Sequence, residues 1–477
     1  MNDSIRTAAR GLLRPSMATR AVVALCCGAM LAGCAVGPAY QRPDVETPVS
    51  FKEGRGEWVK AVPADALERG PWWELFNDPT LSELAARVEV SNQNVAAAVA
   101  RYAQARALVA EQRASLFPTV SLDVGASRSG AGGGTPTRSS YQIGVGGSWE
   151  PDVWGRLRRG VDSARAGQQA SQADLQAARL SAQGELAVNY FNLRAFDTQR
   201  ALQNETIAGY ERTLRIAQNR YNAGIVARTD VFQAETQLTN ARAELLGLER
   251  QRATLEHAIA VLVGQAPAMF DLPVQAAPVG VVPDIPFDVP STLLQRRPDI
   301  AAAERRAAQA NEQIGIAQSA WYPSLRLTGS GGVGAAAIGD LFNASALVWS
   351  LGTSLAQTLF NAGGTRARVE SARAGLEEAA AQYRQTVLSA FRDVEDQLVA
   401  SRILAQQLVL RQEAARTANL VEQQVLNRYL AGQVNFTEVI NAQITAQNAR
   451  RAVAQALSDR QVAAVALTQA LGGGWRG

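Results

Sequence analysis

Side chains that could carry out catalysis or bind a metal are scarce in this chain of 477 residues. It has three cysteines and one histidine, His257. A zinc site takes about four Cys or His ligands, and a Ser-His-Asp or Cys-His catalytic group would have to use His257 alone. His257 stands between Glu256 and Ile259 in a helical pattern, where a lone histidine is more often packed or solvated than a ligand. No paired carboxylates, phosphate loop or nucleophile motif stands out, so we predict neither an enzyme nor a cofactor.

The charge balance gives no reason to expect a nucleic acid as partner. Lys and Arg number 47 against 43 Asp and Glu, a net charge of +4. Nucleic-acid-binding proteins show a pronounced basic patch or stripe instead. Removal of the arginine-rich first 33 residues would leave the chain close to neutral.

The one cysteine whose surroundings predict chemistry is Cys34. Four arginines precede a short apolar run over residues 21–30, as in a secretory signal, and Leu-Ala-Gly stands directly before Cys34. This segment resembles the lipobox of bacterial lipoproteins, in which the signal, here residues 1–33, is cleaved and the cysteine receives lipid on its sulfur and amine. The alternative is an ordinary signal peptide with an incidental cysteine. Residue 35 is Ala, not the Asp that resembles an inner-membrane retention signal, so an outer-membrane destination is implied.

The rest of the chain is one unit written twice. Residues 116–122 reappear at 321–327, and RYNAG at 220–224 reappears as RYLAG at 428–432. The landmarks keep their order at offsets near 205 to 208, which indicates a tandem duplication. We therefore predict a first repeat over 79–264, a linker over 265–290 and a second repeat over 291–472. The segment 34–78 precedes the repeats, and a tail over 473–477 follows them.

Each repeat is expected to hold a helix, a Gly-rich segment, a very long helix, a Gly turn and a closing helix. The first helices are predicted over residues 81 to about 115 and 291 to about 320. From about 156 to 221 there is no proline, and such a helix would reach about 100 Å. Leu186, Leu193 and Leu214 follow a seven-residue grid, which is typical of coiled coils. A plain coiled coil without a channel is the alternative.

Both Gly-rich segments alternate apolar with small or polar residues, which predicts hairpins over about 118–150 and 323–357. Val120, Leu122 and Val124 alternate with Ser121 and Asp123, for example. Alternation over about ten residues is typical of a membrane β-barrel strand. Four strands cannot close a barrel, and open edges are not tolerated in lipid, so several chains would have to share one barrel. Two soluble hairpins packed on the helices remain the alternative.

Four sequence words then resemble one known family. They are VGPAYQRP at 36–43, WWELFNDPTL at 72–81, LLQRRPDIAAAER at 293–305 and ALGGGW at 470–475. Together, and in this order, they resemble the TolC-like outer-membrane efflux proteins of the lipoprotein (NodT/OprM) type. The resemblance implies an α+β membrane protein in which three chains share a β-barrel, each chain giving four strands. The long helices would form a coiled-coil barrel in the periplasm, with an equatorial region from residues 35–78, 265–290 and the C-terminal tail.

The same resemblance implies a passive duct for drugs or other small toxic compounds. Its partners would be two further copies of itself, a periplasmic membrane-fusion adaptor, an inner-membrane RND-type transporter and the lipid of the outer membrane. It would be lipid-anchored there through Cys34, with no other cofactor. A duct for type I protein secretion and a non-conducting, envelope-spanning coiled-coil lipoprotein are the alternatives.

The two Gly turns are the candidate functional positions. Gly224 and Gly432 stand where a helix must reverse, and glycine adopts the left-handed conformation there at little cost. Asp230 follows in the region of a helix N-terminus, where a carboxylate is favourable. The resemblance also implies that these tips, with Arg220, Tyr221 and Arg428, form a closed mouth and the grooves for adaptor docking.

The resemblance extends to a gate at this mouth. A family hydrogen bond between a tyrosine and an aspartate corresponds to Tyr429 and Asp230, so it can form here. A second family bond pairs an arginine with a threonine. Thr229 is present, but Val434 stands at the arginine position, so that bond is missing. A ring of carboxylates inside the mouth corresponds to Glu438 and Asn441, which leaves one acid and one amide.

Overall fold

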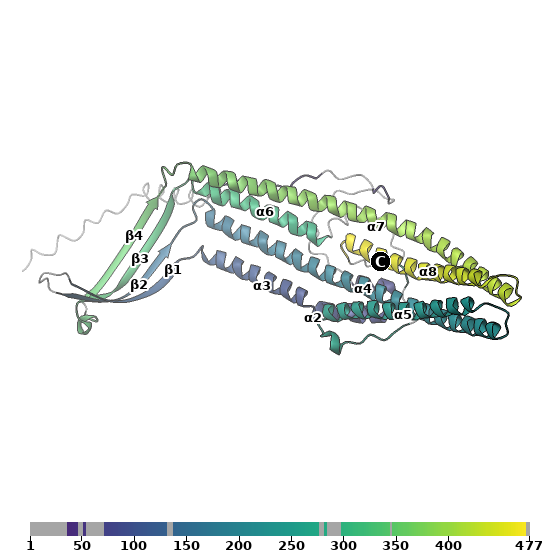
Figure 1. The fold of residues 1–477 in the computed structure, drawn as a ribbon. Coiled ribbons are helices and arrows are strands. Elements are labelled where there is room, and N and C mark those ends of the chain that lie inside the picture. The colour runs from purple at the N-terminus through teal and green to yellow at the C-terminus, as the bar shows by residue number, and fades with distance from the viewer. Residues whose placement is uncertain are drawn as a thin grey trace, which may run out of the picture. The chain divides into compact units, whose positions relative to one another are not determined.

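The computed structural model describes residues 36–45, 51–53, 71–130, 137–275, 281–283, 297–343 and 346–473. The predicted signal, Cys34, part of the 265–290 linker and residues 474–477 lie outside these residues. Both halves of the chain share one order of elements, namely a helical segment, two strands, a very long helix and a shorter closing helix (Figure 1).

The duplication is confirmed by the bounds of the helices. In the first repeat α4 spans Arg156–Asn222, 67 residues, and α5 spans Arg228–Leu262, 35 residues. In the second repeat α7 spans Gly364–Leu430 and α8 spans Phe436–Ala470, again 67 and 35 residues. All four pairs of ends are therefore 208 residues apart, so each residue of α4 and α5 has a defined counterpart in α7 and α8.

The expectation of one helix from 81 to about 115 is wrong, because the chain forms two. Helix α2 spans Pro79–Ser91 and α3 spans Gln93–Ala114. Asn92 interrupts them with an extended backbone, and its side-chain oxygen accepts from the amides of Asn94 at 2.9 Å and Val95 at 3.1 Å. Its side-chain nitrogen donates to the carbonyl of Leu262 at 2.8 Å. A buried asparagine that caps one helix and binds another fixes this break.

The first helix of the second repeat begins later than expected. Helix α6 spans Pro298–Ser319, whereas residues 291–296 lie outside the described chain. Proline is favoured at the first position of a helix because its missing N–H costs nothing there. Arg297, just before it, is held by Asp299 at 2.7 Å and by the carbonyl of Ala470 at 3.2 Å.

The chain divides into two compact units. The first contains the chain up to Arg42 together with Gln104–Gln168 and Arg305–Ala381. The second contains Pro43–Ala103, Gln169–Glu304 and Gln382–Gly477.

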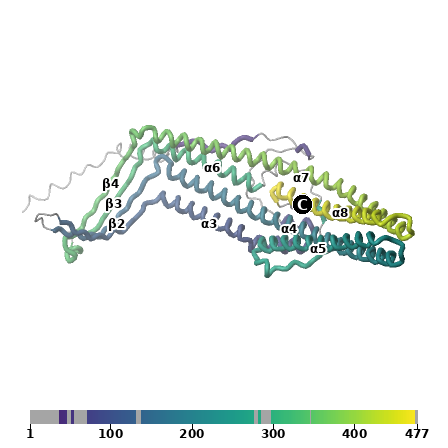
Figure 2. Tube along the Cα trace, in the orientation of Figure 1, coloured from purple at the N-terminus to yellow at the C-terminus, as the bar shows by residue number. Residues whose placement is uncertain are grey.

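Both expected hairpins are present in the first unit and form one sheet. The strands are β1 (Thr119–Ser129), β2 (Arg138–Trp149), β3 (Ser324–Ala335) and β4 (Leu347–Ala356). They lie in the order β1-β2-β3-β4, and every neighbouring pair is antiparallel (Figure 1). The trace of β2, β3 and β4 can also be followed in Figure 2. Asp152 lies between β2 and α4, and its carboxylate accepts from the amides of Leu157 at 3.0 Å and Arg158 at 2.8 Å at the start of α4.

The register of the sheet separates its side chains into two faces. Leu122 pairs with Val145, Val145 with Gly331 and Gly331 with Trp349, so these positions share one face. The large apolar side chains on this face are exposed. They include Val120, Leu122, Val124, Leu347, Trp349, Leu351 and Leu355. The opposite face carries mainly Ser, Thr and Gly, and there the hydroxyls of Ser330 and Ser350 lie 2.9 Å apart.

The core of the second unit is made by the motif around residues 72–81 and by the long helices. Trp72 and Phe76 are almost fully buried, and the Phe76 ring lies 4.9 Å from that of Phe191 on α4. Asp78 caps α2, accepting from Leu81 at 3.1 Å and from the Tyr190 hydroxyl at 2.6 Å. The seven-residue grid packs as predicted: the core includes Leu186 and Leu193 from α4 and Val387, Val394 and Leu398 from α7.

Candidate functional site

The two hairpin tips, where α4 meets α5 and α7 meets α8, end in the same type of turn. Gly224 has φ of 71° and Gly432 has φ of 74°, both left-handed as predicted. The amide of Gly224 donates to the carbonyl of Tyr221 at 2.9 Å, and that of Ile225 to Arg220 at 2.9 Å. Gly432 and Gln433 repeat these bonds onto Tyr429 and Arg428, each at 2.9 Å. This pair of bonds is the Schellman motif, which uses up carbonyls at the end of a helix.

The following helices begin differently in the two repeats. Asn435 caps α8, its side chain accepting from the amide of Glu438 at 3.1 Å, whereas Ala227 starts α5 without a side-chain cap. Asp230 and Glu438 are the acidic residues of the first turns. Their charges are favourable at the positive end of the helix dipole. These carboxylates therefore have a structural role at the tips.

Tyr429 lies inside a small apolar cluster at the tips. It is 2% exposed, and its ring lies 5.4 Å from that of Phe436. Ala217 and Ala234 from the first repeat, with Val439 and Ile440 from the second, complete the buried part of this cluster. Burial raises the pKa of the Tyr429 phenol, nearby Arg220 opposes that shift, and Asp230 adds to it. The ring of Tyr429 therefore joins the two repeats by apolar packing.

Arg220 is the polar link between the two tips, a role that the sequence did not reveal. Its guanidinium donates to the carbonyl of Tyr429 at 2.7 Å and to that of Leu430 at 3.4 Å. It also lies over the Tyr429 ring, 4.7 Å from the centroid. A cation favours the negative end of a helix dipole and the face of an aromatic ring. We call this set of contacts the Arg220 clasp.

The expected hydrogen bond between Tyr429 and Asp230 is not made in this structure. Among the described residues the Tyr429 hydroxyl is buried without a hydrogen-bond partner. The Asp230 charge acts on the phenol, yet the two groups do not reach bonding distance. The physical reason is that Tyr429 is held by its ring and carbonyl, through Phe436 and the Arg220 clasp, and not by its hydroxyl.

The remaining predicted positions lie around these tips. Thr229, Glu438 and Asn441 are exposed, as are Tyr221 and Arg428. Val434, at the position of the missing arginine, packs against the apolar cluster. The structure thus brings the predicted residues to neighbouring tips, but it joins them through Arg220.

The exposed apolar face of the sheet is a second candidate surface. Aromatic side chains stand at the ends of the strands next to the helices: Phe117 before β1, Trp149 ending β2, Trp321 before β3 and Phe360 after β4. In the antiparallel order β1-β2-β3-β4 these four ends lie at one side of the sheet. A band of apolar residues bordered by aromatic residues is typical of a strand face in a bilayer.

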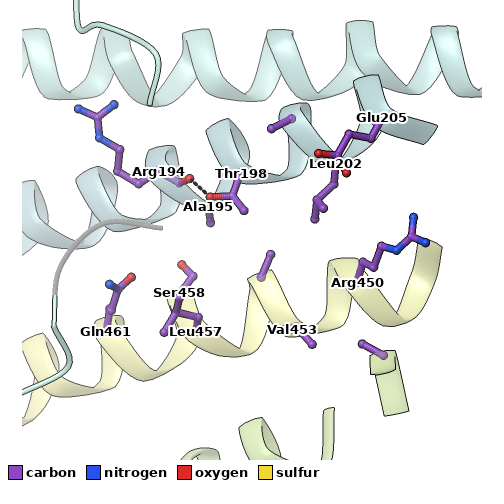
Figure 3. Close-up of a pocket in the computed structure, with 13 residues that line it drawn as sticks. Arg194, Ala195, Thr198, Leu202, Glu205, Arg450, Val453, Leu457, Ser458 and Gln461 are labelled. Carbon is purple, nitrogen blue, oxygen red and sulfur yellow. Dashed lines mark hydrogen bonds between the residues drawn. The ribbon is translucent and has the colours of Figure 1, made fainter. Parts of the chain in front are cut away.

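A groove of about 390 Å³ lies between α4 and α8 in the second unit (Figure 3). Its walls include Leu202, Val453 and Leu457, with Arg194 at one end and Arg450 near the other. The volume is that of a small-molecule pocket. Polar side chains also line the groove, among them Thr198, Glu205 and Ser458.

No helix among the described residues is both long and apolar enough to cross a bilayer. No group of three or more His, Cys, Asp or Glu residues in the described part of the chain could hold a metal ion.

Comparison with known proteins identifies the family. A family model described as outer membrane efflux protein matches residues 83–265 and 289–473. The pyoverdine export outer membrane protein OpmQ of Pseudomonas aeruginosa is 30% identical, over 97% of this chain and 98% of OpmQ. The cation efflux system protein CusC of Escherichia coli is 26% identical, over 94% of this chain and 98% of CusC. The solved outer-membrane channel OprN has a TM-score of 0.84 at 28% identity, covering 93% of this chain and 100% of that one. These matches confirm the resemblance found in the sequence, and the chain belongs to the outer membrane efflux protein family.

Proposed function

We propose that this chain is the outer-membrane duct of a tripartite efflux system and that three copies share one barrel of twelve strands. The duct conducts passively, while an inner-membrane RND-type transporter and a periplasmic membrane-fusion adaptor supply energy and cargo. The observation that carries this proposal is the four-stranded sheet with one exposed apolar face and one small, polar face. Such a sheet suits lipid on one side and a water-filled lumen on the other.

The dimensions and edges of the sheet support a shared barrel. Its strands contain 10 to 12 residues. At about 3.4 Å per residue and a tilt of about 45°, they span roughly 25 Å, the height of the apolar band of such barrels. Strands β1 and β4 are the two edges, and unpaired edge groups are not tolerated in lipid. In a ring of three chains, β4 of each chain pairs with β1 of the next.

The cargo is a small compound or ion. OpmQ is named for pyoverdine export and CusC for cation efflux, so two relatives of nearly the same length are named for different small cargoes. These names support efflux over the alternative of protein secretion. The chemistry of the substrate is therefore selected elsewhere in the assembly, by the transporter.

The N-terminus anchors the first unit to the membrane through lipid on Cys34. Two residues later the amide of Val36 donates to the carbonyl of Trp154 at 3.2 Å, just beyond the end of β2. Trp154 in turn stacks on Tyr322 at 4.8 Å and donates to the carbonyl of Pro323 at 2.8 Å, just before β3. The chain after Cys34 thus lies at the aromatic end of the sheet, within reach of the bilayer surface. Residues 1–33 are the signal in this scheme.

The helix tips form the periplasmic mouth of the duct and the surface for the adaptor. Gly224 and Gly432 shape the turns, and the Arg220 clasp holds the two tips of one chain together. Exposed Thr229, Glu438 and Asn441 line the mouth, with Asp230 and Tyr429 beside them. In this scheme the segments 34–78 and 265–290 and the tail 473–477 belong to the equatorial region, and the two repeats are 79–264 and 291–472.

Two neighbouring residues of β4 test the membrane placement of the sheet. Leu351, 83% exposed, lies on the apolar face, and Ser350 lies on the polar face. We expect Leu351→Arg to cost about 2–4 kcal/mol per chain and to abolish stable insertion, because a charge then faces lipid. Ser350→Arg places the same charge in the lumen and should insert normally, with altered ion selectivity. Equal membrane-extracted yields of both variants would refute a lipid-facing apolar face.

Conductance in planar bilayers tests the duct itself. We expect purified trimers to conduct weakly, and Arg220→Ala to raise the conductance because it removes the clasp at the mouth. The control is Arg215→Ala, which removes an exposed arginine of α4 that lies further from the tip. A trimer that conducts with neither the native sequence nor Arg220→Ala would exclude a channel and favour a non-conducting coiled-coil lipoprotein.

A further inference from the structure

The arginine and the tyrosine of the Arg220 clasp, and the turn glycine beside them, recur in the other repeat. At the offset of 208 residues Arg220 corresponds to Arg428, Tyr221 to Tyr429 and Gly224 to Gly432, with the same residue type in each pair. Both arginines are in the last turn of a long helix, and both tips have the same turn geometry. The chain therefore contains two donors and two acceptor sites for the same contact.

Only one of the two possible clasps is closed within the chain. Arg220 binds the carbonyls of Tyr429 and Leu430 and covers the Tyr429 ring. Its guanidinium also lies 3.9 Å from the position that a Cβ would take on Gly432. The acceptor site on the second repeat is thus fully occupied by an arginine of the first repeat.

The corresponding acceptor site on the first repeat has no arginine bound to it among the described residues. The Tyr221 ring is 41% exposed, whereas its counterpart Tyr429 is 2% exposed. Nothing lies within 4 Å of a Cβ position on Gly224. The side chain of Arg428, the counterpart donor, is exposed and has no hydrogen-bond or ion-pair partner among the described residues. The donor and the acceptor both lack the contact that their counterparts make.

We propose that Arg428 closes the junction between subunits by clasping the first-repeat tip of a second copy of this chain. Its guanidinium donates to the carbonyls of Tyr221 and Asn222 of that copy and covers the Tyr221 ring. This inference rests on the trimer proposed above. In a ring of three chains the six tips alternate between first and second repeats, so Arg220 closes the three junctions inside chains and Arg428 the three junctions between them.

The chemistry of the clasp suits a junction that must open. Arginine remains charged at all relevant pH values, and its acceptors are main-chain carbonyls at the negative end of a helix. The contact therefore does not depend on the ionisation of a carboxylate, and it is independent of the pairing of Tyr429 with Asp230. Opening of the mouth requires only that the guanidinium leaves one helix end and one ring.

Matched cysteine pairs test the position of the junction. Arg428→Cys with Asn222→Cys joins the proposed partners between chains, and Arg220→Cys with Leu430→Cys is its exact counterpart within one chain. A short bifunctional maleimide should convert the first pair into dimers and trimers on denaturing gels. The second pair should react at the mass of the monomer. Cys34, the other cysteine of the processed chain in our scheme, is present in both.

The outcomes separate this inference from the proposed function. A native trimer in which the control pair reacts but Arg428→Cys with Asn222→Cys gives no interchain product would overturn the clasp and leave the duct intact. A protein that is monomeric by native mass would overturn the trimer itself.

Conductance tests independently whether Arg428 keeps the mouth closed, because mere proximity of the two tips would not make conductance depend on this side chain. We expect Arg428→Ala to raise the open-to-closed ratio about tenfold or more, the loss expected for a charged hydrogen bond. Arg428→Lys should restore part of the closure, because it keeps the charge but loses the planar fork. Arg215→Ala should behave as the native chain. Native-like conductance of Arg428→Ala in a folded trimer would contradict the proposal.

Discussion

We expect a buried cluster of ion pairs in the second unit to hold the linker after α5 against helices α4 and α5. The Asp197 carboxylate on α4 is fully buried and lies 2.7 Å from Arg252 on α5 and 2.9 Å from Arg194. It also accepts from the amide of Gln275 in the linker at 3.1 Å. Both arginines donate to linker carbonyls as well, Arg194 to Pro273 at 2.7 Å and Arg252 to Leu272. Asp197→Ala would remove the carboxylate that Arg194 and Arg252 share, so the positive charges of these two buried guanidinium groups would no longer be balanced.

The size of the effect follows from this imbalance. Arg252 retains its second carboxylate partner, Glu256 at 3.0 Å. Arg194 keeps the Pro273 carbonyl and the face of the Tyr190 ring, but no carboxylate among the described residues. Breaking a buried ion pair on one side costs about 3–5 kcal/mol. Since each 1.4 kcal/mol or so is a factor of ten in an equilibrium constant, local opening of the linker should rise by roughly two to four factors of ten.

Hydrogen exchange by mass spectrometry measures this opening directly. We expect the amides of Leu272 and Gln275 to lose protection in Asp197→Ala, whereas those near Gly224 and Gly432 remain unchanged. Glu413→Ala is the matched control, because it breaks an ion pair with Arg416 that is exposed at the surface. Such pairs contribute little to stability.

The reasoning fails if Asp197→Ala leaves exchange in the linker at the native rate. It also fails if Glu413→Ala loosens the linker as strongly, since the effect would then follow from loss of any acidic residue. Asp197→Asn keeps the shape and one acceptor, so it should lie between Asp197→Ala and the native chain.

Three further predictions concern buried polar groups. Burial and the bond to Asp78 raise the pKa of Tyr190 above its ordinary 10.0. The contribution of the protonated Tyr190 hydroxyl to stability is therefore complete below pH 10 and is lost as the pH rises further. Tyr190→Phe should lower the melting temperature at pH 8, and the melting temperature of this variant should fall less steeply between pH 10 and 11 than that of the native chain. Tyr429→Phe removes a hydroxyl without a partner, so it should leave stability and conductance unchanged or slightly raise stability; a clear rise in conductance would show that the hydroxyl is bonded. Asn92→Ala removes the cap of α3 and should cost about 0.5–2 kcal/mol in thermal unfolding, against no change for the exposed neighbour Asn94→Ala.

Local patterns in the sequence predicted the strands, the long helices and the order of the elements. Apolar alternation predicted both hairpins, the seven-residue grid and the absence of proline predicted α4, and the glycines predicted the turns at Gly224 and Gly432. Each of these signals depends on residues within one element, so no knowledge of distant contacts was needed. The break at Asn92 was missed because that residue is fixed by its bond to Leu262, 170 positions away.

The sequence by itself determined the duplication, the family and the elements of each repeat, because repeated words, periodicity and turn residues are readable along the chain. It presents Arg220 and Arg428 as equivalent, and it offers Tyr429 and Asp230 as partners. Only the tertiary structure decided that the Arg220 side chain is engaged while that of Arg428 has no partner among the described residues, and that the Tyr429 hydroxyl is unpaired. The physical reason is that these contacts depend on how helices about 200 residues apart in the sequence pack against each other. One chain has two tips and therefore one junction between them, so only one of the two equivalent arginines can make the contact inside the chain.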